Sequence, residues 1–182
     1  MSAAIEQELD RAIFLGSGTG GEPLGVFPGA ATYGITETAI GAAASYAAFR
    51  AAAVRFMTAN AANSIDEINL ALRPEVFDGM DADLITGTAV SEWDRLVAKI
   101  KNVVLTPNGI AEPAGDPRAS AALLNTSTNG VPPIFCGLWG AVDMIRDPYS
   151  DAKSGQLRLT GLLTADVTVA RGAQLEILTG VE

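Results

Sequence analysis

The stretch IEQELDRAIFLGSGTGGEPLGV, residues 5–26, joins an amphipathic segment directly to a glycine-rich loop. Its first half carries three apolar residues at helical spacing, with acidic residues between them: Ile5, Leu9 and Ile13. This spacing predicts a helix over residues 3–14. The second half contains three glycines that fit G-x-G-x-x-G, a pattern of loops that bind nucleotide phosphates: Gly16, Gly18 and Gly21. The residues around the loop decide between a phosphate site and a structural bend.

A dinucleotide-binding loop needs a strand before its glycines and a helix after them, so that the phosphates meet the helix N-terminus. Here the predicted helix comes before the loop. The following segment, residues 22–34, is rich in proline and glycine, which prevents an immediate helix. We therefore interpret the loop as a structural bend. A small nucleotide-binding enzyme that uses Gly16 to Gly21 is the alternative from another functional class.

The composition excludes several kinds of site. The chain of 182 residues has no histidine and one cysteine, so it has no histidine general base, intrachain disulfide or multi-cysteine metal motif. Twelve Lys and Arg against 21 Asp and Glu give a formal charge of -9, which disfavours specific binding of nucleic acid. No run of about eighteen apolar residues is free of charge. We expect neither a membrane span nor a secretory signal peptide.

The middle of the chain is predicted to alternate helices and strands. The patterns predict four elements: a helix over residues 36–60, a strand over 68–72, a helix over 91–100 and a strand over 102–106. Three aromatic side chains of the first helix are expected in the core: Tyr46, Phe49 and Phe56. Ser91 is expected to cap the second helix. Residues 107–133 are predicted to form either a long surface loop with a short helix near residues 120–124 or a mobile tip.

The C-terminal third is predicted to form antiparallel β structure. Three short alternating runs of apolar residues are separated by turn residues: 157–159, 167–169 and 175–177. Together with the middle of the chain, they predict a mixed sheet covered by helices. The stretch RDPYSDAKSG, residues 146–155, is interpreted as a turn.

Four groups of residues are candidates for chemical sites. An acidic group that would suit a hard cation is interpreted as a solvated turn: Asp78, Asp81 and Asp83. Cys136, between apolar neighbours, is expected to be a buried thiol. A serine beside a lysine and a possible acid pair both fall in the predicted turn: Lys153 with Ser154, and Asp147 with Asp151 and Tyr149. We therefore expect no catalytic, cofactor or metal site.

Two stretches resemble the major capsid protein of tailed bacteriophages, which has the Hong Kong 97-like fold. Residues 5–26 are similar to the end of that family's long spine helix and the glycine-rich bend after it. Residues 135–178 are similar to its closing region, in which IRDPY, SGQLRLTGLL and ADVTVARGAQL follow one another. The similarity runs through the chain in order, with a weakly patterned middle.

The resemblance implies an α+β, Hong Kong 97-like fold, a mixed sheet with flanking helices. Residues 1–30 would be the end of the spine helix and its bend, a remnant of the peripheral domain. Residues 31–170 would form the axial domain around the centre of a pentamer or hexamer, with a tip in the loop 107–133. Residues 171–182 would return to the peripheral domain. Family members carry an N-terminal arm and a β-hairpin loop before the spine helix, so we expect a truncated subunit, shortened by cloning or in a prophage gene.

The implied function is that of a structural virion protein, not an enzyme. The subunit would self-associate into capsomers of a phage or prophage head and contact packaged DNA only non-specifically. It would need no cofactor, small-molecule substrate or membrane, and it would reside in the virion capsid after passing through the host cytoplasm. An encapsulin-like shell protein is the alternative with the same fold.

Overall fold

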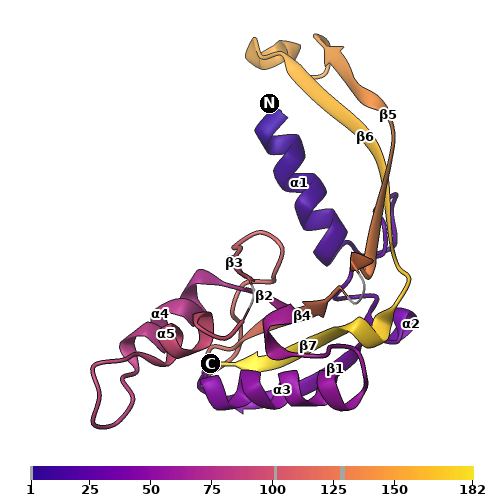
Figure 1. The fold of residues 1–182 in the computed structure, drawn as a ribbon. Helices are drawn as coiled ribbons and strands as arrows, with labels where there is room; N and C mark the ends of the chain where they lie inside the picture. Colours follow the sequence, from indigo (N-terminus) through magenta and orange to yellow (C-terminus); the bar gives the residue numbers. More distant parts are fainter. Residues whose placement is uncertain (1, 101, 128–129) are drawn as a thin grey trace.

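The computed structural model describes residues 2–100, 102–127 and 130–182. Apart from short 3₁₀ turns, its elements are α1 (Ser2–Leu15), α2 (Ala30–Tyr33), β1 (Thr36–Ala42), α3 (Tyr46–Thr58), β2 (Ile68–Leu72), α4 (Pro74–Ala82), α5 (Glu92–Val97), β3 (Asn102–Leu105), β4 (Ser120–Thr126), β5 (Ile134–Asp147), β6 (Arg158–Val169) and β7 (Leu175–Val181). Figure 1 shows two parts: a body built on a sheet, and a long hairpin of β5 and β6 that projects from it beside α1.

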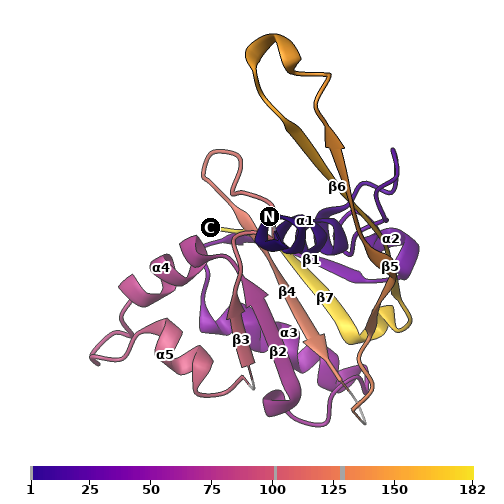
Figure 2. The ribbon, with the colours of Figure 1, turned by 90° about the horizontal axis from the view of Figure 1, so that it is seen from above.

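The body contains a mixed five-stranded sheet in the order β1-β7-β4-β2-β3 (Figure 2). The two outer pairs, β1 with β7 and β2 with β3, are parallel, whereas β4 runs antiparallel to both of its neighbours. This is the mixed sheet predicted from the sequence. Residues 171–182 include β7, which lies in this sheet between β1 and β4.

Both faces of the sheet are covered. Leu123 and Leu124 are fully buried on opposite faces, because successive side chains of a strand alternate. The face of Leu124 packs against α3, α4 and α5 in a core that includes Phe49, Phe56, Leu70, Met80, Leu96 and Leu178. The face of Leu123 packs against the segment around α2, through Val26, Ala30, Ile35, Leu175 and Ile177. The aromatic residues expected in the core, Tyr46, Phe49 and Phe56, are buried there.

The predicted helix over residues 36–60 was wrong in its first third. Residues 36–42 form β1, which pairs in parallel with β7, and α3 begins only at Tyr46. Gly41 has a φ of +59°, and the Ser45 hydroxyl accepts a hydrogen bond from the Ala48 N–H, so the helix has a defined start. The alanine content favoured a helix, but pairing with β7 overrides that preference.

The loop predicted over residues 107–133 is also partly wrong. Its expected short helix is the strand β4, which pairs with β2 and β7 at the centre of the sheet. Burial of nearly every β4 side chain accounts for its lack of alternation, which hid the strand in the sequence. Residues 128–129 of this predicted loop lie outside the described part of the chain. The loop between α4 and α5 also projects from the body (Figure 1).

Several local predictions were confirmed. The helix over residues 3–14 is α1, the strands over 68–72 and 102–106 are β2 and β3, and the Ser91 hydroxyl caps α5 by accepting from the Asp94 N–H. At the C-terminus, the first two of the three short strands are one continuous strand, β6, and the third is β7. None of the described helices has the length and apolar character needed to cross a membrane.

Candidate functional site

The glycine-rich loop is a tight bend between α1 and the body. Gly18, Gly20 and Gly21 all have positive φ, and Ser17 bridges back to Leu24. A Cβ atom at Gly16 would lie 2.4 Å from the Ala12 carbonyl oxygen, so no larger residue fits there without movement. A helix precedes the loop and no helix follows it at once, which is the wrong context for a dinucleotide site.

Two hydrogen-bond donors of this bend, both on Ser17, are taken by a carboxylate of the same loop. Glu22 accepts from the Ser17 N–H at 3.1 Å and from the Ser17 hydroxyl at 2.9 Å, and it also pairs with Arg11 of α1. The Ser17 N–H, followed by Arg11, lowers the pKa of Glu22 to about 2. A phosphate bound at Ser17 would have to displace this charged group, and the pairing of Glu22 with Arg11 joins the bend to α1.

The other predicted candidates are brought into no common site. Asp78 and Asp81 lie on α4 and Asp83 just after it; they are solvated, as expected, but the turn predicted there is a helix. In the described part of the chain, no group of three or more acidic or cysteine side chains is placed to hold a metal ion.

The candidates of the predicted turn lie at the hairpin tip, between β5 and β6. Asp147 accepts from the Ser150 hydroxyl and from two backbone N–H groups, which lowers the pKa of Asp147. Asp151 pairs with Arg158, and Lys153 and Ser154 are exposed in a 3₁₀ turn. The turn interpretation is confirmed. Cys136 is exposed on β5, so the prediction of a buried thiol was wrong, because β5 leaves the body.

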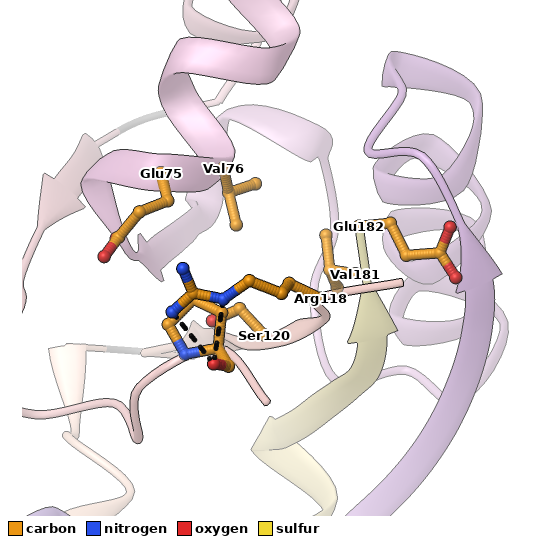
Figure 3. Close-up of a pocket in the computed structure, with 7 residues that line it drawn as sticks. Glu75, Val76, Arg118, Ser120, Val181 and Glu182 are labelled. Atoms are coloured by element: carbon orange, nitrogen blue, oxygen red, sulfur yellow. Dashed lines mark hydrogen bonds between the residues drawn. The ribbon is translucent and has the colours of Figure 1, made fainter. Parts of the chain in front are cut away.

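One hollow of the described surface, about 130 Å³, lies at the edge of the body (Figure 3). There Arg118 donates hydrogen bonds to the Pro113 carbonyl oxygen beside Glu75 of α4 and Glu182 after β7. A larger one, about 540 Å³, is an open groove between α1 and β6 with mainly apolar side chains, among them Ile5, Leu9, Leu159 and Leu163.

The hairpin has two distinguishable faces. A Cβ atom at Gly161 would lie 3.0 Å from the Ile5 Cδ1 atom, so the odd-numbered residues of β6 face α1. The even-numbered residues therefore point away from α1, together with the β5 residues directly opposite them. We call this side the outer face; its residues are Phe135, Gly137, Trp139, Asp143, Ile145, Asp147, Arg158, Thr160, Leu162, Thr164, Asp166 and Thr168.

The outer face carries large apolar side chains that are about half exposed. Their exposed fractions are 46% for Phe135, 57% for Trp139, 51% for Ile145 and 51% for Leu162. The ring of Trp139 lies across Gly137, where a Cβ atom would come within 2.6 Å of the indole. Large apolar side chains that gather on one exposed face are typical of interaction surfaces.

The sequence interpretation missed this surface. The signal was present before the turn at 146–155: apolar residues occupy both alternation phases of residues 134–145, which is unusual for a strand with one solvated face. The hairpin is anchored at its base by Tyr33, whose hydroxyl donates to the carbonyl oxygens of Leu24 and Val167. Burial, with a smaller effect of Asp166, raises the pKa of Tyr33. This residue ties the hairpin to the glycine bend.

Comparisons with known proteins place the whole chain in one structural class. No protein-family model and no curated protein matches the sequence. Among solved structures, the capsid of the native GTA particle superposes with a TM-score of 0.62 at 16% identity, over 100% of this chain and 64% of that one. The virus-like particle of Pyrococcus furiosus gives 0.61 at 8% identity, over 96% and 64%. The SrpI encapsulin of Synechococcus elongatus gives 0.58 at 11%, over 98% and 62%. The chain thus spans less than two thirds of each of these proteins.

Proposed function

We propose that this chain, which has the Hong Kong 97-like capsid fold, is a shell-forming structural protein: a major capsid subunit of a phage or prophage head that self-associates into capsomers. The observation that carries the proposal is the superposition of nearly the entire chain on proteins whose structures are those of a capsid, a virus-like particle and an encapsulin complex. The exposed apolar side chains of the outer face support it, because a shell subunit must bury surface against other copies.

The division of the chain that we propose follows the two parts of the structure. The sheet body would be the axial part around the capsomer centre, and α1 with the hairpin would be the peripheral part. Compared with the boundaries expected from the sequence, residues 134–169 move to the peripheral part and residues 171–182 to the axial part. The loop 83–91, which projects from the body, replaces the loop 107–133 as the proposed tip near the axis.

The proposed partner is the chain itself. Packaged DNA would be contacted only non-specifically, because a formal charge of -9 opposes attraction of the phosphate backbone. The proposed role would need no catalytic residue, cofactor or metal. It would assemble in the host cytoplasm and remain in the virion capsid.

An encapsulin-like shell protein is the second candidate within the same fold, and the similarity to the Synechococcus encapsulin favours it. The two differ in what the shell encloses. Co-purification of a cargo enzyme, or a cargo gene beside this one, would support the second candidate, whereas neighbouring tail and terminase genes would support the first.

The alternative from another class, a small nucleotide-binding enzyme, makes an opposite prediction. It requires that the chain binds a nucleoside triphosphate and that Gly18→Val abolishes binding. Calorimetric titration of the purified chain with ATP and GTP, with Gly18→Val as the paired variant, tests it directly. We expect no heat of binding, because Glu22 already occupies the donors of Ser17.

The test of the proposed function is the mass of the chain across a concentration series by light scattering, with negative-stain microscopy of the heaviest fraction. Rings or closed particles support a shell subunit. A strict monomer at every concentration would contradict self-association of residues 1–182.

A further inference from the structure

We propose that the outer face of the hairpin is a contact between two copies of the chain, stacked face to face with the two hairpins antiparallel. This inference rests on the proposed function and names the surface that carries it. The occupant is a second copy of the same face, related by a two-fold axis.

Four large apolar side chains of the outer face are about half exposed: Phe135, Trp139, Ile145 and Leu162. The side toward α1 has a partial cover, because Ile5 lies against Gly161 and Val167 is buried. Leu138 and Leu159 on that side are nevertheless also about half exposed. A sheet buries its apolar side chains against another element, and a two-stranded hairpin by itself is only marginally stable in water. A second layer over the outer face would bury these four side chains, which lie among polar residues.

The outer face is formed by two paired strands. The Trp139 ring lies over Gly137, where a Cβ atom would come within 2.6 Å of the indole. On β6, threonines at positions 160, 164 and 168 lie on the same face as Leu162. Paired strands with side chains of this size suit another sheet, which packs about 10 Å away.

The charges of the hairpin favour a second copy of the chain, with its hairpin antiparallel to the first. The hairpin tip, residues 146–158, has three basic and two acidic side chains, a net charge of +1. The shaft, residues 134–145 and 159–169, has two acidic side chains and no basic one, a net charge of -2. Antiparallel stacking lays the tip of each hairpin over the shaft of the other, so that unlike charges meet twice. A nucleic acid would meet a repelling shaft.

Two outer-face residues of β6 define the charge contact. Arg158 lies at the tip end, Asp166 lies near the base, and Leu162 is midway between them. Stacking about Leu162 brings Arg158 of one copy toward Asp166 of the other, at both ends of the contact. Arg158 already pairs with Asp151, and its side chain stays 56% exposed, so it can bridge to a second carboxylate.

The first experiment uses the two tryptophans of the chain, Trp93 and Trp139. Trp93 is partly buried and packs edge-on against Phe77 at 4.8 Å. In Trp93→Phe, the emission therefore reports on Trp139 alone, with the outer face unchanged. We expect a blue shift of the emission and reduced acrylamide quenching as the concentration rises, in step with the mass from light scattering.

The second experiment reverses the charges. Asp166→Arg and Arg158→Asp should each raise the dissociation constant of the pair about 5- to 10-fold, and the double variant should recover most of the loss. Arg146→Asp is the matched control, because Arg146 is an exposed arginine of the same tip that lies opposite Leu159, on the side toward α1. It should change the constant less than 2-fold. Circular dichroism verifies that each variant is folded.

The outcomes separate this inference from the proposed function. In one outcome, the chain self-associates while Trp139 stays accessible to acrylamide and the charge reversals leave the dissociation constant unchanged. That result would overturn the stacking but not the proposal of a shell subunit. A monomer at all concentrations would contradict both. A blue shift caused by anionic phosphatidylserine vesicles, and not by protein concentration, would assign the outer face to a membrane and overturn the stacking as well.

Discussion

Arg55 of α3 forms an ion pair with Glu176 of β7, whose side chain is only 2% exposed inside the sheet. The Arg55 Nε donates to the Glu176 Oε1 at 2.8 Å, and the Thr38 hydroxyl of β1 donates to the same oxygen at 2.8 Å. The buried carboxylate of Glu176 thus joins β7 to α3 and to the neighbouring strand β1. This contact lies near the start of the C-terminal strand.

Removing the arginine should be costly, because it leaves the buried carboxylate without its counter-charge. We expect Arg55→Ala to lower the free energy of unfolding by about 2–4 kcal/mol, as measured by urea denaturation. Arg50→Ala is the control, since Arg50 lies only near the Tyr46 ring, 5.9 Å from its centroid, and should cost under about 1 kcal/mol. Equal losses in the two variants would contradict a structural role for the pair.

Two glycine-to-alanine substitutions should change the stability of the protein in opposite directions. Gly79 lies in α4 with nothing within 4 Å of a new Cβ atom, so Gly79→Ala should stabilise the protein by about 0.5–1 kcal/mol. Gly25→Ala would bring its Cβ atom to 2.5 Å from the Gly16 nitrogen at the bend, so it should destabilise. Midpoints of thermal unfolding measure both; a neutral Gly25→Ala would mean that the bend is looser than described.

The bend should weaken in acid through Glu22. Its pKa falls from an ordinary value of 4.5 to about 2 in the folded chain, so its stabilising effect is complete above about pH 4.5 and is lost as the pH drops toward 2. Glu22→Gln should therefore be less stable than the parent near pH 6, and the difference should shrink between pH 4.5 and 2. Urea midpoints of both proteins across this range give the measurement. A difference independent of pH would assign the effect to shape and not to charge.

Cys136 should react as an exposed thiol. It lies on the projecting hairpin, on the side toward α1 and outside the proposed stacking contact. At low protein concentration, we expect a chromogenic disulfide to modify it in the native chain at a rate within about 10-fold of the rate in denaturant. Protection of 100-fold or more would show that the hairpin folds back onto the body.

Much of the local structure was readable from the sequence. The helix at 3–14, the strand at 68–72 and the Ser91 cap follow from spacing and side-chain chemistry within a few residues, and all three were confirmed. The glycine-rich segment forms a bend after a helix, as its local context predicts. Histidine, disulfide and multi-cysteine sites were excluded by composition alone.

The sheet and the hairpin needed the tertiary structure. Residues 36–42 and 120–126 read as helical because alanine favours helices, and only pairing with β7 makes both of them strands. Cys136 reads as buried because its neighbours are apolar, but burial depends on whether a strand stays in the body or leaves it. Periodicity records preferences over a few residues, whereas pairing partners and solvent exposure are set by contacts far apart in the chain. The sequence by itself therefore determined the bend and the absence of histidine, disulfide and multi-cysteine sites. Tertiary contacts decided the order of the strands in the sheet and the exposure of the outer face.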